Sequence, residues 1–164
     1  MNAPLLRPAA WHDAGACGAI YRPYVTGTWA SFELDPPDDA EMARRIEDYG
    51  ASHAWFVAEV DGVVAGYAYG CPHRSRAAYA SSCDVAIYVA AAAAGRGLGR
   101  LLYGALLPML RERGYHAAFA GIAQPNPASV ALHLSAGFAP VGTYREVGWK
   151  LGAWRDVAWF QRLL

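Results

Sequence analysis

The chain has 164 residues, 55% of them hydrophobic, and its 14 basic and 14 acidic side chains give a formal net charge of +0. This length predicts a single domain over residues 1–164, because single hydrophobic cores divide only beyond roughly 250 residues. The neutral balance excludes a general nucleic-acid binder, which needs many basic groups to neutralise phosphates. Residues 1–61 carry ten acidic and four basic side chains, whereas residues 62–164 carry ten basic and four acidic ones. This asymmetry indicates either a small anionic partner or two complementary surfaces of one fold.

The cysteines and the N-terminus point to a cytoplasmic protein. Cys17, Cys71 and Cys83 are odd in number and widely spaced, so they form neither a disulfide framework nor a zinc pattern, and we expect no metal. We interpret them as free thiols in a reducing compartment. Residues 1–10 lack a charged leader with an apolar core, and no apolar run reaches the roughly 18 residues of a membrane span, so no membrane partner is expected.

Two helices are expected in the first third of the chain. Asp13 can cap a helix that runs to about Tyr24. An aromatic loop follows at residues 28–33. Asp38 and Glu41 then form an Asp-x-x-Glu cap that opens a second helix.

Strands and helices alternate in the rest of the chain. Residues 54–60 and 63–69 are apolar and rich in strand formers, and Asp61-Gly62 between them is a strong hairpin signal. The later elements are expected to be strand 84–89, helix 98–113, strand 115–122, helix 127–136, and paired strands 142–149 and 154–162. Hairpins at both ends of a β-α-β-α-β segment predict a mixed α/β sheet.

A glycine-rich turn between a strand and a helix is the most informative segment. It reads VAAAAAGRGLGR over residues 89–100. Glycines let the backbone approach a ligand closely, and free amides at the start of a helix favour a phosphate. A Walker loop ends in Gly-Lys-Ser/Thr, but Gly99 is followed by Arg100. A dinucleotide fingerprint needs Gly-x-Gly-x-x-Gly, and here the third glycine arrives one position early.

The spacing of the turn resembles the pyrophosphate loop of the GNAT superfamily of acetyl-CoA-dependent acyltransferases, Gln/Arg-x-x-Gly-x-Gly/Ala. Ala94 stands where this motif has Gln or Arg. Residues 126–138 resemble a second landmark of the superfamily, a helix that begins at Asn126 and ends at Gly-Phe. His133 stands where many members have a tyrosine that faces the sulfur of the cofactor.

From Tyr21 to Phe160 the chain resembles the phosphinothricin N-acetyltransferase branch of this superfamily, including its methionine sulfoximine and sulfone acetyltransferases. The matching stretches are Thr28-x-x-Ser-Phe-Glu33, Ala-Glu-Val-Asp-Gly at 58–62, Arg74-x-Arg76-x-Ala-Tyr79, Ile87-Tyr88-Val89, Gly97-Leu-Gly99 with Leu102-Tyr103, residues 126–138, and Gly148-x-Lys150-x-Gly-x-Trp154-x-Asp156-Val157. Asp84 stands where the branch usually has a glutamate, so a carboxylate is kept with a shorter reach.

The resemblance implies a GNAT-like fold, with a mixed, mostly antiparallel sheet flanked by helices. It also implies transfer of an acetyl group from acetyl-CoA to a primary amine. The amine arrives as an ammonium and must lose a proton, and both Asp84 and His133 are candidates for the base. The residues expected to bind acetyl-CoA are Ile87, Tyr88, Val89, Gly95, Arg96, Gly97, Leu98, Gly99, Arg100 and Asn126.

An anionic, amino-acid-like substrate is implied by two arginines spaced two apart. Arg74 and Arg76 offer planar guanidinium groups that bind a carboxylate or phosphinate at two points. By resemblance, Phe32 and Tyr79 form apolar walls around that substrate. The alternative interpretation of the two arginines is an exposed basic turn.

Other functions stay open at this point. Cys83 or Cys17 could carry the acetyl group, but neither has an evident activating base, so direct transfer is expected. The amine could belong to a protein N-terminus or an aminoglycoside. Ala94 and Asp84 also fit a catalytically silent acetyl-CoA-binding module. A homodimer is expected from the resemblance alone.

Overall fold

The computed structural model describes residues 3–164, which form one seven-stranded sheet in the order β1-β2-β3-β4-β5-β7-β6. The strands are β1 (Leu5–Pro8), β2 (Ala54–Val60), β3 (Val63–Pro72), β4 (Ser82–Val89), β5 (Ala117–Ala123), β6 (Ala139–Lys150) and β7 (Ala153–Leu163). Every neighbouring pair is antiparallel except β4 and β5, which are parallel. The expectation of a mixed, mostly antiparallel sheet is confirmed.

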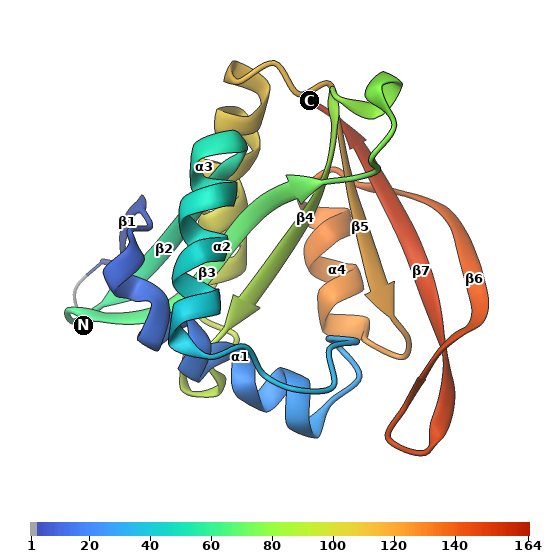
Figure 1. Cartoon of the computed structure of the whole chain (residues 1–164), viewed down its shortest axis with the longest axis horizontal. Helices are drawn as coiled ribbons and strands as arrows, with labels where there is room; N and C mark the ends of the chain where they lie inside the picture. The colour runs from blue at the N-terminus through green and yellow to red at the C-terminus, as the bar shows by residue number, and fades with distance from the viewer. Residues whose placement is uncertain (1–2) are drawn as a thin grey trace.

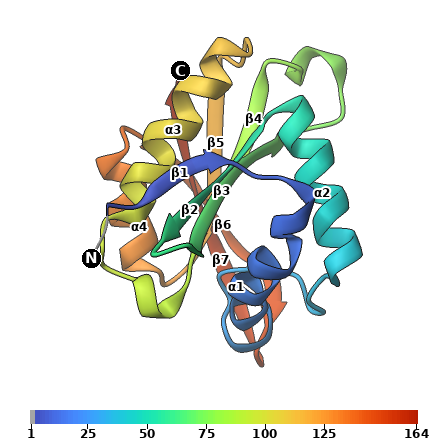
Figure 2. The ribbon, with the colours of Figure 1, turned by 90° about the vertical axis from the view of Figure 1, so that its left-hand side faces the viewer.

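Helices cover both faces of this sheet. They are α1 (Ala14–Gly27), α2 (Asp39–Ser52), α3 (Leu98–Glu112) and α4 (Pro127–Ser135), with short 3-10 helices η1 (Trp11–Asp13), η2 (Ala77–Tyr79) and η3 (Ala91–Ala93). Figure 2 shows α1 and α2 on one side of the sheet and α3 and α4 on the other. Within residues 3–164, no helix is long and apolar enough to cross a membrane.

Each face of the sheet has its own hydrophobic core. Met42 and Ile46 of α2 are buried against Tyr67 of β3 on one face. On the other, leucines one helical turn apart in α3, such as Leu102 and Leu106, have no exposed surface and pack on the sheet. The strands are therefore covered on both faces, which fixes their register.

Three local signals in the sequence are confirmed. Asp61 and Gly62 have φ angles of 51° and 81°, as a two-residue hairpin turn with the twist of its strands requires. The Asp38 carboxylate accepts the Glu41 amide at 2.8 Å, and Asn126 caps α4 by accepting the Ser129 amide at 3.1 Å. The second cap matters for function, because it sets where α4 begins beside the glycine turn.

The N-terminal region differs from expectation. Strand β1 was not expected, and it pairs along the free edge of β2. Asp13 does precede α1, but its carboxylate makes no hydrogen bond to the helix. It binds the Arg7 guanidinium through two 2.8 Å contacts and the Ala10 amide at 2.9 Å. The charged arginine of a neighbouring strand thus outcompetes the helix amides for this carboxylate.

Candidate active site

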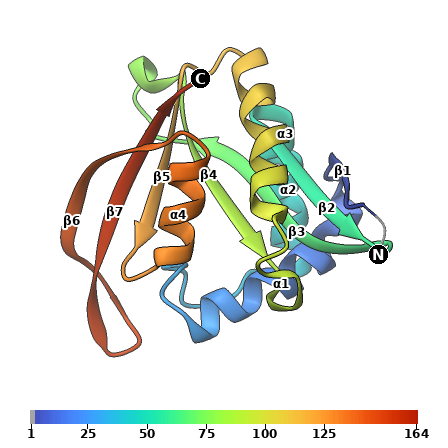
Figure 3. The same ribbon diagram turned by 180° about the vertical axis from the view of Figure 1, so that it is seen from behind.

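The parallel strands β4 and β5 diverge after three paired positions. Their register joins Ser82 to Ala117, Cys83 to Ala118 and Asp84 to Phe119, and no pair follows. Figures 1 and 3 show the two strands meeting at one end of the molecule and separating toward the other, with α4 beside the gap. Within residues 3–164, positions 85–89 of β4 therefore have no strand partner on this side, which leaves backbone groups available to a ligand.

A cleft of about 790 Å³ occupies this divergence. Its walls are residues 85–89 of β4, the glycine turn, residues 120–123 of β5 and one side of α4. Nine of the ten residues expected to bind acetyl-CoA line it, namely Ile87, Tyr88, Val89, Gly95, Gly97, Leu98, Gly99, Arg100 and Asn126. The tenth, Arg96, is exposed and does not line the cleft.

The three glycines of the turn have two different structural roles. Gly95 and Gly97 have φ angles of +75° and +78°, which side chains rarely adopt, and a Cβ on either would meet open space. Gly99 instead allows α3 and α4 to approach, because a Cβ there would lie 2.8 Å from Leu132 Cδ2. Leu98, between them, is buried and anchors the start of α3. The turn thus presents the first amides of α3 to the cleft, where an anion is favoured.

Asp84 lies at the last paired position before β4 and β5 separate. Its Oδ1 is 2.6 Å from Nδ1 of His73, a residue that follows β3. Burial raises the pKa of Asp84, while the hydrogen bond and charge of His73, and more weakly the charge of Arg74, oppose that rise. Its other oxygen, Oδ2, has no hydrogen-bond partner among residues 3–164. Asp84 does not line the cleft itself but directly precedes Val85, the first residue of β4 that does, so its free oxygen makes it a candidate general base.

The other candidate base, His133, is enclosed. It is 3% exposed, and both ring nitrogens are engaged: Nδ1 lies 2.7 Å from the Ser129 carbonyl and Nε2 lies 2.7 Å from the Tyr103 hydroxyl. A carbonyl can only accept, so Nδ1 carries the proton and Nε2 accepts from Tyr103. Burial lowers the pKa of His133, so it is held neutral at one wall of the cleft.

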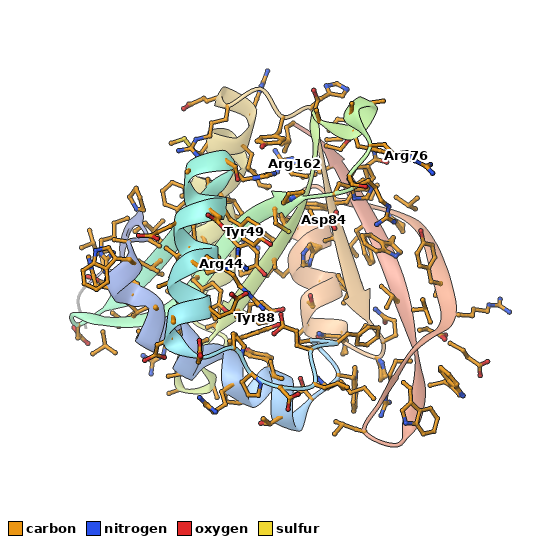
Figure 4. The ribbon with its side chains drawn as sticks, viewed as in Figure 1. Arg44, Tyr49, Arg76, Asp84, Tyr88 and Arg162 are labelled. Carbon is orange, nitrogen blue, oxygen red and sulfur yellow. The ribbon has the colours of Figure 1, made fainter. Side chains whose placement is uncertain are left out.

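Three of the four residues expected to bind substrate, Arg74, Arg76 and Tyr79, lie in the exposed segment between β3 and β4, and the fourth, Phe32, lies elsewhere. Arg74 and Arg76 are exposed, and Figure 4 shows Arg76 at the same end of the molecule as Asp84. The centroid of the Tyr79 ring lies 5.7 Å from that of His73, so Tyr79 contacts the histidine that is hydrogen-bonded to Asp84. Phe32 lies apart from them over Gly148 of β6, where any Cβ would collide with its ring.

Two residues of this region, His73 and Lys150, are not among the site residues that the sequence predicts. Lys150 is 5% exposed, and its ammonium donates to the backbone carbonyls of Ser31 and of Glu33, the latter at 2.8 Å. It therefore holds the loop that carries Phe32. His73 stands beside the Arg74-x-Arg76 motif, but no spacing rule connects it to Asp84, since β3 and β4 must first pair.

Comparison with known proteins identifies the family. The profile of the acetyltransferase (GNAT) family matches residues 21–138, which include most of the cleft. The chain belongs to this family. It is therefore an N-acetyltransferase whose acyl donor is acetyl-CoA, and the cleft between β4 and β5 suits that donor, with unpaired strand on one side and helix amides on the other.

Three individual proteins are notably similar to this N-acetyltransferase. The L-methionine sulfoximine/L-methionine sulfone acetyltransferase of Salmonella typhimurium is 39% identical, over 91% of this chain and 88% of the relative. The phosphinothricin acetyltransferase of Sinorhizobium meliloti, solved in complex with AcCoA, has a TM-score of 0.94 and 34% identity over 99% of this chain and 89% of its own. The ribosomal-protein-alanine N-acetyltransferase of Brucella melitensis has a TM-score of 0.94 and 37% identity, over 98% and 99%.

Proposed function

We propose that the chain, as a single acetyltransferase domain, acetylates the amino group of an amino-acid-like substrate of the phosphinothricin, methionine sulfoximine or methionine sulfone type. The position of Asp84 carries this proposal. It stands where the acetyl-CoA cleft meets the exposed segment with Arg74, Arg76 and Tyr79. The names of the two relatives from Salmonella and Sinorhizobium support the substrate class.

In the proposed mechanism Asp84 accepts the proton of the substrate ammonium on Oδ2. The freed amine attacks the thioester carbonyl, and the backbone amides of Ile87 and Val89, on the unpaired side of β4, stabilise the oxyanion. The C–S bond then breaks, and CoA leaves as a thiolate that takes the remaining amine proton by way of solvent. The first amides of α3 hold the pyrophosphate. His133 contributes a neutral wall, since its proton-accepting nitrogen is already taken by Tyr103. The base role thus falls to Asp84.

Direct transfer to the amine is part of the proposal. Cys17 and Cys83 have no exposed surface, and burial raises the pKa of Cys17, Cys71 and Cys83 to about 12. None of the three lines the cleft. A buried thiol that stays protonated is a poor nucleophile, so an acetylated cysteine is not expected. The thiols are free, which agrees with the proposed location in the cytoplasm.

We also propose a homodimer formed through β6. This strand is the edge of the sheet, and four of its apolar residues are more than half exposed: Val141, Tyr144, Val147 and Trp149. An exposed apolar edge strand calls for a partner, and a second copy of the chain offers the same surface. Light scattering coupled to size-exclusion chromatography measures the mass, and a monomer at micromolar concentration contradicts this part.

Release of CoA thiol over a panel of amines tests the substrate class. The panel holds phosphinothricin, methionine sulfoximine, methionine sulfone, ordinary amino acids, an aminoglycoside and a peptide with an N-terminal alanine. The amino-acid analogues are expected to have the highest kcat/KM. Preference for the peptide would support a second candidate, suggested by the Brucella neighbour. Tight acetyl-CoA binding without turnover on any amine would identify a silent binding module.

A further inference from the structure

His73 and Asp84 form a pair that no assigned role explains. His73 follows the last residue of β3, and its Nδ1 lies 2.6 Å from Oδ1 of Asp84 on β4. The exposed fractions of the two side chains are 11% and 27%. A short hydrogen bond between partly buried groups is stronger than one in water, because the surroundings screen it less.

Aromatic side chains fix the orientation of the His73 ring. It stacks on Phe119 of β5 with ring centroids 4.3 Å apart and an angle of 16° between the planes. The rings of Tyr79 and Trp159 stand edge-on to it at 5.7 and 6.3 Å. Groups from β5, β7 and η2 thus hold the imidazole, and its N–H points at the carboxylate without further ordering.

The pair solves a difficulty that a buried aspartate base faces at neutral pH. Burial favours the protonated acid, which cannot accept a proton from the ammonium. A hydrogen bond to the carboxylate favours the charged form and also fixes its rotation, so that Oδ1 is occupied and Oδ2 stays free. His73 is the only hydrogen-bond donor to Asp84 within residues 3–164.

We propose that His73 is a positioning residue for the base: it keeps the Asp84 carboxylate ionised and leaves Oδ2 free for the substrate ammonium. The inference rests on the proposed role of Asp84. In the step itself, one N–H bond of the ammonium breaks and an O–H bond forms on Oδ2. The nitrogen lone pair then bonds to the acetyl carbon, the C–S bond breaks, and the CoA thiolate takes the second proton of the nitrogen by way of solvent. The carboxyl later returns its own proton to solvent.

The other titratable or charged groups near the pair are weaker influences. Cys71 and Cys83 flank Asp84, but burial raises the pKa of both thiols to about 12, so they stay neutral between pH 5 and 9. Tyr79 touches only the ring edge of His73. Arg74 is exposed, so solvent screens its charge. A change in the ionisation of Asp84 on mutation of His73 is thus assignable to the hydrogen bond.

Two substitutions separate hydrogen bonding from packing. His73→Phe keeps a flat ring on Phe119 and removes the N–H, whereas His73→Asn supplies an amide N–H near the position of Nδ1. The pH profile of kcat/KM for the amine and the ¹³C carboxyl shift of Asp84 are measured from pH 5 to 9. With His73→Phe we expect the acidic limb and the Asp84 titration to move about one unit upward, which lowers kcat/KM by up to about tenfold on the acidic side of the profile. His73→Asn should recover most of this loss, and KM for acetyl-CoA should not change.

Controls make each outcome decisive. His53→Phe is the matched control, because His53 also stacks on an aromatic ring, Tyr115 at 4.6 Å, and makes no contact with Asp84. In an Asp84→Asn background, His73→Phe should change kcat/KM less than twofold. If neither the pH profile of kcat/KM nor the Asp84 titration moves in His73→Phe, the proposal is overturned and His73 has only a packing role. A loss of a thousandfold or more at every pH would overturn it by making His73 the base.

Failure of the proposed function is distinguishable from failure of this inference. A wrong substrate class appears as absence of turnover by the wild-type enzyme on the panel. The ¹³C titration of Asp84 needs no turnover and still compares wild type with His73→Phe. Melting temperatures of all variants identify any that fail to fold. If His73→Phe fails to fold, His73→Asn supplies a second measurement.

Discussion

The two halves of the proposed active site differ in composition, since one consists mainly of backbone and the other of side chains. The acetyl-CoA half, from residue 87 through the glycine turn to the start of α4, is made largely of backbone held by local conformation. The amine half, around Asp84, is made of side chains brought together from β3, β4 and β5. Backbone tolerates a changed side chain, which explains how Ala94 can stand where the motif has Gln or Arg. The arrangement of side chains around Asp84, by contrast, changes when any one of them is replaced.

The largest expected effect is on the amine half. Asp84→Asn removes the proton acceptor, and kcat/KM for the amine should fall about 10²- to 10⁴-fold, the usual contribution of a general base. Binding of acetyl-CoA, measured by calorimetry, should be unchanged, since Asp84 does not line the cleft. Asp48→Asn on the exposed surface of α2 is the control. Equal losses in catalysis and acetyl-CoA binding would show that the two halves are not separable.

Arg76→Ala tests whether the exposed arginines recognise an anionic substrate. Loss of a charged hydrogen bond of about 1.5–3 kcal/mol should raise KM for the amino-acid substrate about 10- to 100-fold. KM for acetyl-CoA should stay constant. Steady-state kinetics with both substrates varied give the two values, and Arg22→Ala on the exposed side of α1 is the matched control. A parallel rise in both constants contradicts the assignment.

Gly97→Ala should have the opposite effect on the two KM values, raising that for acetyl-CoA and not that for the amine. Its φ of +78° costs a side chain about 1–2 kcal/mol, so relaxation of the turn should raise KM for acetyl-CoA about 5- to 30-fold and leave KM for the amine nearly unchanged. Gly104→Ala, in the middle of α3, is the control. An added Cβ there meets open space, so the change should stabilise the helix by up to about 1 kcal/mol. Unchanged acetyl-CoA kinetics in Gly97→Ala would remove the turn from the cofactor site.

The same contrast explains which features the sequence could predict. The hairpin at Asp61-Gly62, the cap at Asn126 and the glycine turn all depend on residues within a few positions of one another, and their conformations are confirmed. The His73–Asp84 contact and the Lys150 support of the Phe32 loop join residues that only the folded sheet brings together. Asp13 illustrates the reverse error, since its local capping signal yields to Arg7 on a neighbouring strand.

The smallest expected effect is that of replacing His133, which tests whether this residue only lines the cleft or acts as the base. Burial lowers its pKa in the folded protein, whereas the unfolded chain has the ordinary value of about 6.5. Below pH 6.5 the unfolded state therefore binds more protons, so the free energy of unfolding falls as pH decreases until the folded pKa is reached. His133→Gln should reduce this loss, measured by urea denaturation between pH 7.5 and 5. His53, whose pKa burial also lowers, should contribute to the slope that remains.

At pH 7.5, His133→Gln should change the unfolding free energy by about 1 kcal/mol or less, because the amide oxygen can still accept from Tyr103. Activity should stay within about threefold of wild type. His116→Gln, at an exposed histidine, is the control for activity and should leave it unchanged. A loss of activity in His133→Gln as large as that in Asp84→Asn would transfer the base role to His133. The proton would then have to be accepted at Nε2 after Tyr103 moves away, and the acid-base chemistry would belong to the acetyl-CoA half of the site.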